Sequence, residues 1–539
     1  MHGLSAVSAI VPVLVMSAVL VFFVYYSYIF FQRVSLFRFL TKTSTLISIK
    51  HTLLITAIAL LVAIPIGTMA AIYLSEYASP AIRRILKSCL EALADLPTAV
   101  CGFLVLIFFG IGDIYITGLV TGVLIAPIVS FLSEKAISKV PKSLRQRDSD
   151  MELSKGKVIV NVVLRAACPG IIASFAIAAS RALGITMIAL HGIPSMTTFI
   201  RKNFNRLNYE DVFVVGLVLL LMTVSLTSFG YWLRRCPPHS IRVRPISDTV
   251  TDSPSSKSQG NAFFGHLLWD RGFTIIGLLS ALLGVVMIGL LLTTYIKLLP
   301  DALDTDFYGF LSQFFKSPFI DNVAVNAAVN SACLLVLTVL FSFSLSIGTA
   351  LYLEEYGPSK RFKQFLGFTI ANLATVPSLL YGFVGLVIFA PLLQPLTYGR
   401  VILVAALMLT LVVLPILTIE LRAALRAVPR VLRQTAYARG MSRRQVISRI
   451  ILPAAFPGIL AALLRSLSRS AGEVVPLSIL MNTLRMLFIG SNPFDQPLPL
   501  QLFFFPVMLL FIPIIFVNVA AGLLRDRYYH RRSSLLRSR

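Results

Sequence analysis

Long apolar runs separated by short polar segments dominate the chain and predict a bundle of transmembrane helices. A helix that crosses the hydrocarbon core of a bilayer, about 30 Å thick, needs roughly 20 apolar residues. Twelve such runs occur, in two sets of six. The first set lies near residues 11–31, 52–74, 92–112, 114–132, 168–190 and 212–233. The second lies near residues 273–296, 323–350, 371–393, 400–419, 456–481 and 502–524. We therefore expect an all-α polytopic membrane protein.

A polar stretch between the two sets predicts the domain boundaries. Residues 234–262 begin with basic residues and become rich in Ser, Pro and Asp. Such a composition cannot bury a core and is typical of a flexible linker. We expect a first six-helix domain at 1–233, a cytosolic linker at 234–262 and a second six-helix domain at 263–539.

The two sets of helices are copies of one repeat. Residues 140–146 (VPKSLRQ) match residues 428–434 (VPRVLRQ), and 166–171 (AACPGI) match 454–459 (AAFPGI), both at an offset of 288. Upstream, the Glu-Tyr pair that begins at Glu76 recurs 279 residues later. Because six spans separate equivalent points, the repeat is parallel and both halves have the same orientation in the membrane.

Composition and charge place the protein in a membrane rather than on a nucleic acid. The chain is 57% hydrophobic and 13% charged, with a mean hydropathy of +0.85. Its net charge of +25 is gathered in short loops, which argues against a nucleic-acid partner. The loops at 133–165 and 422–449 are the most basic and are expected in the cytoplasm. Both termini then also lie in the cytoplasm, although the basic loop at 33–50 disagrees with this orientation.

No pattern in the chain predicts a catalytic or metal site. The five cysteines are scattered, with no C-x-x-C pair and no histidine at ligand spacing. The nucleotide-binding pattern G-x-x-x-x-G-K-[ST] and the zinc pattern H-E-x-x-H are both absent from the sequence. We expect no enzyme activity and no cofactor or metal in this chain, so that energy must come from a partner.

One cytoplasmic loop of the second half carries a recognisable motif. Gln434-Thr435-Ala436, Gly440 and the segment that ends at Pro453 follow the spacing E-A-A-x3-G-x9-I-x-L-P. This resembles the EAA loop of ABC importer permeases. The resemblance implies a coupling helix that seats in a groove of a cytosolic ABC ATPase dimer, which binds the ATP and Mg.

The candidate coupling residues of this loop are Gln434, Ala436, Gly440, Arg443 and Pro453. Small residues at Ala436 and Gly440 allow close approach, Gly440 can turn the chain, and Pro453 suits the start of the next helix. Arg443 could pair with an acidic group on the partner. An alternative is that a basic amphipathic loop lies on anionic lipid headgroups.

The first half departs from the motif. The family's acid is replaced by glutamine in both halves, at Gln146 and Gln434, and the glycine is replaced by Glu152 in the first. We expect the first loop to dock less tightly than the second, or to an adapted ATPase surface.

Further segments resemble the two permeases of the bacterial phosphate ABC importer, fused in one chain. They are residues 70–77 (AAIYLSEY), 350–356 (ALYLEEY), 371–382 (ANLATVPSLLYG), 180–184 (SRALG) and 469–473 (RSAGE). The resemblance implies the type I permease fold, inorganic phosphate as substrate, a periplasmic phosphate-binding protein as partner, and the bacterial inner membrane as location.

Charged residues inside predicted spans are candidates for the substrate pathway. Arg465, Arg469 and Glu473 recur every four residues and so share one helix face. Charges in hydrocarbon are costly and usually face a polar interior. Arg469 could hold a phosphate oxygen, while Glu473 balances it. In the first half Arg181 either pairs with Glu473 across the pathway or stays uncompensated. The alternative is a structural Arg–Glu pair that locks helix packing.

Two other functions fit the same span pattern. A secondary transporter driven by an ion gradient also has twelve spans in two parallel halves, but it needs no coupling loop. A fused ABC permease for ferric iron or thiamine would keep the loop and differ only in substrate.

Overall fold

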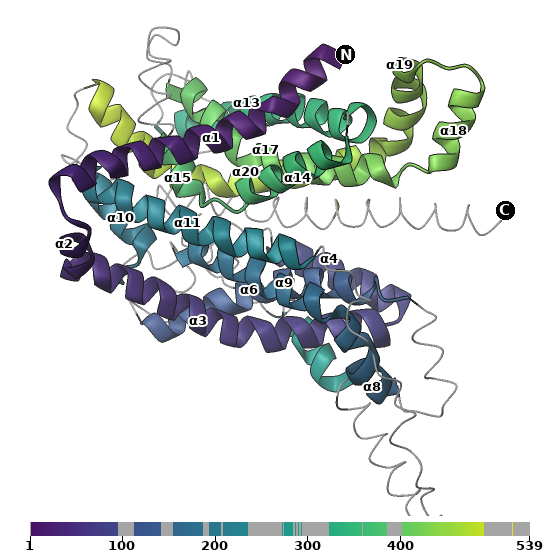
Figure 1. The fold of residues 1–539 in the computed structure, drawn as a ribbon, viewed down its shortest axis with the longest axis horizontal. Coiled ribbons are helices and arrows are strands. Elements are labelled where there is room, and N and C mark those ends of the chain that lie inside the picture. Colours follow the sequence, from purple (N-terminus) through teal and green to yellow (C-terminus); the bar gives the residue numbers. More distant parts are fainter. Residues whose placement is uncertain are drawn as a thin grey trace, which may run out of the picture.

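The computed structural model of the chain is a bundle of long helices that run roughly side by side (Figure 1). Described are residues 2–94, 113–141, 155–186, 193–205, 209–234, 272, 274–283, 286, 289, 293, 323–357, 359–384, 401–489 and 520. Every regular element in these residues is helical. The expected all-α fold is confirmed.

The described elements follow the order of the repeat, and four of them, marked η, are single π-helical turns. The first half contains α1 (His2–Arg33), α2 (Leu36–Thr41), α3 (Thr43–Ile72), η1 (Tyr73–Tyr77), α4 (Pro80–Ala94), α6 (Ile114–Ile137), α8 (Lys155–Val158), η2 (Ile159–Val163), α9 (Leu164–Ile185), α10 (Met196–Asn205) and α11 (Tyr209–Leu233). The second half contains a helix at Thr274–Leu283, then α13 (Val323–Leu351), η5 (Tyr352–Tyr356), α14 (Lys360–Leu373), α15 (Ser378–Val384), α17 (Val401–Ala427), α18 (Arg430–Ala438), α19 (Arg443–Val446), η7 (Ile447–Ile451) and α20 (Leu452–Ile489).

Eight of the described helical runs are long and apolar enough to cross a bilayer, and they coincide with eight of the twelve predicted spans. The predicted spans at 92–112 and 502–524 lie almost wholly outside the described residues, and the span at 273–296 does so in part. The linker at 234–262 also lies outside them apart from its first residue.

The predicted continuous span at 371–393 is wrong in its first part, where the helix breaks. Helix α14 ends at Leu373, and α15 starts at Ser378 after a turn. The side chain of Thr375 donates to the carbonyl oxygen of Asn372 at 2.8 Å, which satisfies a backbone group at the break. Pro377 has no N–H and disfavours helical geometry in the residue before it. A broken helix at membrane depth is tolerated where protein buries it.

The π-helical turns recur at equivalent positions of the two halves. The turns η1 and η5 lie 279 residues apart, and η2 and η7 lie 288 residues apart, which are the offsets of the sequence repeat. Each of these turns adds one residue to a helical turn, which rotates the side chains that follow it. Their recurrence shows that the repeat preserves helix irregularities as well as helix positions.

The first helix of each half packs on the opposite half. Ala9 of α1 is buried against Leu353, Leu366 and Ile370 of the second half, and Thr349 donates a hydrogen bond to a carbonyl oxygen of α1 at 2.7 Å. Conversely, the helix at Thr274–Leu283 packs on the first half.

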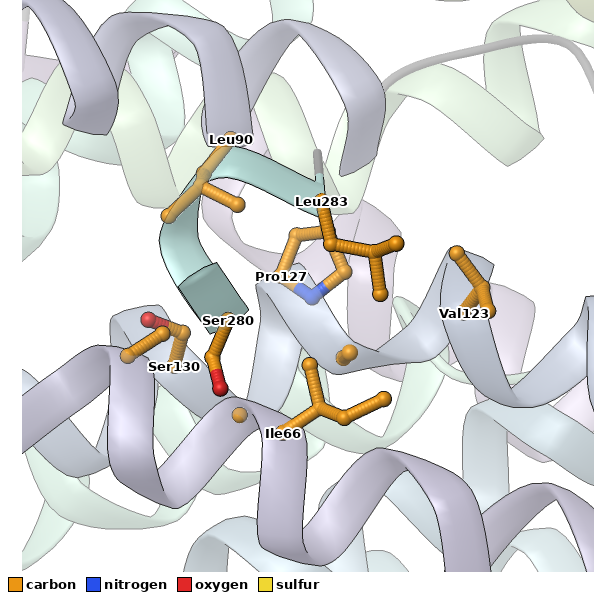
Figure 2. Close-up of a pocket in the computed structure, with 10 residues that line it drawn as sticks. Ile66, Leu90, Val123, Pro127, Ser130, Ser280 and Leu283 are labelled. Carbon is orange, nitrogen blue, oxygen red and sulfur yellow. The ribbon is translucent and has the colours of Figure 1, made fainter. Parts of the chain in front are cut away.

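The helix at Thr274–Leu283 packs on first-half residues whose equivalents in the second half contact α1. Ala281 is buried against Leu74, Leu86 and Leu90. Figure 2 shows a small cavity at this seam, where Ser280 and Leu283 of the exchanged helix lie near Ile66, Leu90 and Pro127.

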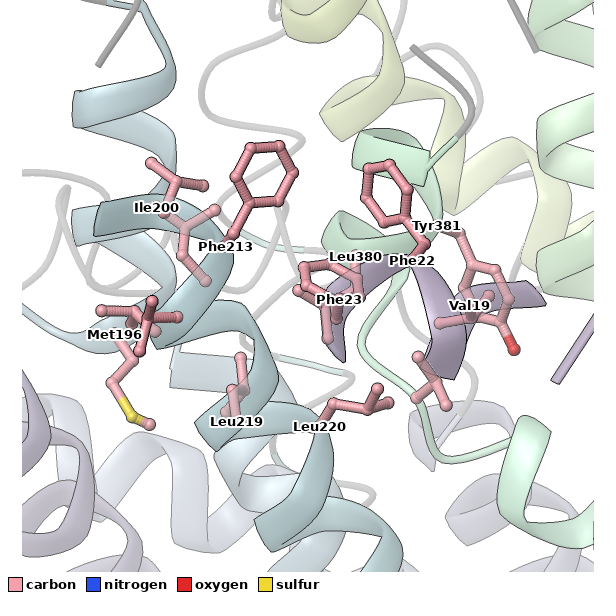
Figure 3. Close-up of a cluster of buried hydrophobic side chains, with 14 of the residues drawn as sticks. Val19, Phe22, Phe23, Met196, Ile200, Phe213, Leu219, Leu220, Leu380 and Tyr381 are labelled. Atoms are coloured by element: carbon pink, nitrogen blue, oxygen red, sulfur yellow. The ribbon is translucent and has the colours of Figure 1, made fainter. Parts of the chain in front are cut away.

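A shared hydrophobic core joins the halves between the exchanged helices. Phe23 of α1 and Leu219 of α11 lie in one cluster with Leu380 and Tyr381 of α15 (Figure 3). A Cβ on Gly216 would approach a ring carbon of Phe23 to 2.5 Å, so this crossing requires the smallest residue. The two halves therefore form one packed body.

The bundle has two distinct ends. Helices α2 and α10 lie at one end, whereas α18 and α19 lie at the other (Figure 1). The basic loop at 33–50, which disagreed with the expected orientation, thus lies at the end opposite the candidate coupling loop. There Lys42 forms an ion pair with Asp211 at the start of α11, which removes part of its positive charge.

Candidate functional site

The candidate coupling loop consists of two short helices joined by a tight turn. Gly440 follows α18 with a φ of +75°, as a glycine that ends a helix does. The N–H of Met441 donates to the carbonyl oxygen of Ala436, and that of Gly440 donates to Tyr437, which together close the end of α18. The predicted turn at Gly440 is confirmed. Helix α19 then begins with a capping box formed by Ser442 and Gln445.

Helix α18 has one face built into the protein and one face exposed. Ala436 is 2% exposed and packs in a core with Leu425, Val428 and other residues of the second half. The close approach expected at Ala436 is therefore made to the protein's own core. On the outer face Val431, Leu432 and Tyr437 are 61%, 46% and 42% exposed, and Gln434 is exposed beside them.

The sequence suggested that Pro453 begins the next helix, but it does not. Helix α19, the turn η7 and helix α20 are continuous from Arg443, so Pro453 lies inside a helical run. The π-helical turn lies directly before it, and the N–H of Leu452 donates to Ile447. The first half has the same turn with Arg165 at the position of Pro453, so proline does not cause it.

Two basic residues attach this loop to the end of α13. Arg433 of α18 forms an ion pair with Glu355 of η5, with 2.6 Å between Nη1 and Oε1. The guanidinium of Arg443 in α19 lies 5.3 Å from the ring centre of Tyr356. Gln146 and Glu152 of the first loop lie outside the described residues.

The predicted stripe of charges on α20 divides into two environments. Arg465 forms a 3.7 Å contact with Glu420 of α17, and its side chain is 12% exposed. In the first half the equivalent residues are Ile177 and Leu132, so both charges of the pair are replaced there by apolar side chains. This arrangement favours a packing role for Arg465.

Arg469 and Glu473 lie further along α20 and are both half-buried. The Nε atom of Arg469 is buried and has no hydrogen-bond partner within the described part of the chain. No ion pair links Arg469 or Glu473 to another described residue. A guanidinium group with one buried nitrogen that lacks a partner among the described residues is suited to an anion that arrives during a transport cycle.

Arg181 lies on α9, in a segment that meets the broken helix of the second half. The neighbouring Ser180 hydroxyl donates to Thr223, and Thr227 Oγ1 lies 2.8 Å from Ser180 Oγ and 2.9 Å from Thr375 Oγ1. A Cβ on Gly184 would lie 3.4 Å from Pro377. Hydroxyl groups from both halves thus surround the helix that carries Arg181.

At the end of the bundle near α18, each half has a cluster of ion pairs. The acid and the base occupy different positions of the repeat in the two halves. In the first half Glu134, 2% exposed, accepts from Arg83 and Lys87. In the second half the position of Glu134 is occupied by Arg422, and the acid is Glu354 of η5.

The second-half pair is also close, and a glycine lies beside it. The distance from Arg422 Nε to Glu354 Oε1 is 2.9 Å, and Arg426 binds the other carboxylate oxygen. Gly367 takes the place of Lys87, and a Cβ there would lie 3.1 Å from an Arg422 nitrogen.

Sequence reasoning missed Glu355, Arg433, Tyr356 and Glu420 as functional candidates. The first three lie in segments that recur between the halves, where they served only as markers of the repeat. Their presence in both halves was the available signal. No group of three or more His, Cys, Asp or Glu side chains that could hold a metal occurs in the residues that the structure describes.

Comparison with known proteins gives matches over both halves. Residues 63–236 and 331–530 match the family of binding-protein-dependent transport system inner membrane components. A probable ABC transporter permease protein of Bacillus subtilis, YqgI, is 31% identical over 176 residues, covering 32% of this chain and 59% of YqgI. The phosphate transport system permease protein PstA homolog of Mycoplasma genitalium is 24% identical over 520 residues, covering 82% of this chain and 77% of the homolog. The phosphate transport system permease protein PstC of Mesorhizobium japonicum is 27% identical over 227 residues, covering 38% of this chain and 68% of PstC. No solved structure matches the chain.

Proposed function

The chain belongs to the family of binding-protein-dependent transport system inner membrane components, and on this premise we propose that it is the permease of an ATP-driven importer of inorganic phosphate. The observation that carries the proposal is the loop of α18 and α19, which projects from an apolar bundle. One face of α18 is fixed in the core, while its other face is exposed. This loop is suited to receive a moving partner, and a secondary transporter does not need it.

The source of energy in this proposal is a separate cytosolic ABC ATPase dimer, which holds the ATP and Mg. The exposed face of α18, with Val431, Gln434 and Tyr437, docks in one subunit of the dimer. The first loop, with Gln146 and Glu152, docks in the other. The two loops are the most basic segments of the chain and therefore lie in the cytoplasm. Both termini lie on the same side of the membrane as these loops.

Phosphate delivered by a periplasmic binding protein passes between the halves. Arg181 and Arg469 contact the anion in turn, and Glu473 balances Arg469 when no anion is present. The Nε atom of Arg469, which has no hydrogen-bond partner among the described residues, supports this assignment. Phosphate is favoured over ferric iron or thiamine because two of the relatives that match this chain carry names that state phosphate transport.

The domain division belongs to the same proposal. A first permease domain at 1–233 and a second at 263–539 are joined by a cytosolic linker at 234–262. The two separate family matches, at 63–236 and 331–530, support two permease units in one chain.

Reconstitution tests the proposed function directly. The chain, its ATPase and a phosphate-binding protein are placed in vesicles, and uptake of labelled phosphate is measured with and without ATP. We expect uptake that requires all three proteins and ATP. Uptake of ferric iron or thiamine with a matching binding protein would replace the substrate, and uptake driven by an ion gradient without the ATPase would overturn the proposal.

A further inference from the structure

Arg433 connects α18, to which it belongs, with η5 and α17. Its Nη1 atom donates to Glu355 Oε1 in η5, and its Nη2 atom donates to the carbonyl oxygen of Leu425 in α17, both at 2.6 Å. Glu355 is 6% exposed and Arg433 is 19% exposed. An arginine held through both arms of its planar fork has one orientation, and charge-assisted bonds of this kind are among the strong ones. The direction of α18 relative to α13 and α17 is thereby fixed.

A second contact attaches the other side of the loop to the same turn. The guanidinium of Arg443 in α19 lies over the ring of Tyr356, the residue after Glu355. A cation over an aromatic face is attracted by the ring. Ala436 and Val446 pack below in the same core. Both short helices are therefore tied to the end of α13.

The chain connectivity shows why this tie matters. Helix α18 follows α17 directly and leads through α19 into α20, so a push on α18 reaches those helices along the backbone. Helix α13 lies about eighty residues earlier, and side chains alone link it to the loop. Helix α13 in turn packs against α1, α17 and α20.

We propose that Arg433 and Glu355 are a positioning pair that transmits displacement of α18 to α13, so that the coupling loop moves α13 together with α17 and α20. The proposal rests on the proposed function, because it assumes that an ATPase displaces α18. Neither residue touches the substrate or the nucleotide. Their role is to keep the loop and α13 in one rigid unit.

The adjacent residue Glu354 offers a matched control. It is an acid in the same π-helical turn with a side chain 11% exposed, and it pairs with Arg422 and Arg426. Both partners belong to α17, so this pair joins two membrane helices and does not reach α18. Loss of either acid removes an ion pair at the same turn, but only the loss of Glu355 breaks a contact between the loop and the end of α13.

The test measures phosphate uptake per ATP hydrolysed in vesicles that contain the full chain, its ATPase and the binding protein. For Glu355→Gln and Arg433→Gln we expect this ratio to fall by about tenfold, the size of a typical coupling effect. The ATPase should still copurify with both variants. The exchanged variant Glu355→Arg with Arg433→Glu should recover part of the ratio, and Glu354→Gln should lower the melting temperature without lowering the ratio. Equal loss of coupling in Glu354→Gln and Glu355→Gln, or an unchanged ratio in Glu355→Gln, would overturn the positioning role.

A second readout does not depend on the substrate. Spin labels at Val336→Cys in α13 and Leu119→Cys in α6, both exposed positions on the bundle, report movement of α13 when the ATPase binds nucleotide. We expect a change of distance in the otherwise unchanged chain and its loss in Glu355→Gln. If the labelled chain with Glu355 intact fails to take up phosphate but still shows the change of distance, the substrate assignment is wrong and the positioning pair stands. A change of distance that persists in Glu355→Gln would overturn the pair whatever the substrate.

Discussion

Single residues on α20 separate a packing role from a transport role. Arg465 has a partner in Glu420, and both are replaced by apolar residues in the first half. Arg469 keeps a buried nitrogen without a partner within the described residues. The sequence placed both arginines on one face, which was correct as helix geometry. It could not show the partner of Arg465, because Glu420 lies on another helix.

The Arg465–Glu420 pair should tolerate joint replacement better than single replacement. Glu420→Leu alone removes this acidic partner of a partly buried arginine and should lower the free energy of unfolding by about 1 to 3 kcal/mol. Adding Arg465→Ile recreates the apolar pair of the first half and should recover most of that loss. Thermal melting in detergent measures the effect. Phosphate uptake should survive in the double variant, and its loss in a stable double variant would return Arg465 to the substrate pathway.

Arg469 and Arg181 should behave differently from Arg465. Replacement of either by alanine should reduce phosphate uptake by at least about tenfold, because a charged hydrogen-bond donor to the anion is lost. Arg469→Lys should restore uptake only in part, since lysine keeps the charge but not the planar fork. Initial rates of ATP-dependent uptake measure both effects. Full uptake by the alanine variants would remove these residues from the pathway.

Among the helical elements, the repeat proved a better guide than hydropathy alone. Apolar run lengths located eight spans that the structure contains, because hydropathy reflects the bilayer thickness directly. They missed the break at 374–377 and the four π-helical turns. The break depends on side-chain hydrogen bonds and Pro377, while a π-helical turn changes no residue's hydropathy. The prediction for Pro453 was wrong because the π-helical turn before it was not foreseen. A proline after such a turn does not have to start a helix.

Because the acid and the base occupy different positions in the two halves, we predict that the second-half arrangement can be built into the first half. Glu134→Arg alone would place a third positive charge beside Arg83 and Lys87, and we expect a loss of about 3 to 5 kcal/mol in stability. Adding Ser75→Glu and Lys87→Gly supplies the acid and the space found at Glu354 and Gly367.

The triple variant should recover more than half of the loss, less the cost of about 1 kcal/mol for a glycine in a helix. Melting temperatures of Glu134→Arg, the triple variant and the unchanged chain make the comparison. A triple variant no more stable than Glu134→Arg would show that the two arrangements depend on different surroundings.

For the whole molecule, the sequence established two equivalent halves but not how they are joined. Equal offsets revealed the duplication, and the linker predicted two six-helix domains. The structure instead places α1 on the second half and the helix at Thr274–Leu283 on the first. No sequence pattern distinguishes an apolar helix that packs on its own half from one that packs on the other half. Both kinds of helix are hydrophobic on all sides.

The exchange of helices predicts a specific cross-link. With the native cysteines removed and a protease site placed in the linker, Ala9→Cys and Leu366→Cys should form a disulfide, since both residues lie in one buried cluster. After cleavage the two halves should then migrate as one band under non-reducing conditions. A pair made of Phe37→Cys, which is exposed at the far end of the bundle, and Leu366→Cys serves as the control. Separation of the halves in the first variant would contradict the exchange.

The position of α1 also sets an order for events during synthesis. The hydrogen bond from Thr349 to Ser8 joins residues 341 positions apart. At translation speeds of about 5 to 20 residues per second, α1 enters the membrane roughly 20 to 70 seconds before Thr349 is made. During that interval the N-terminal part of α1 lacks the second-half residues that cover Ala9 in the finished structure, although α11 of its own half is made earlier. Completion of the second half, rather than of the first, is therefore the event that completes the packing around this part of the helix.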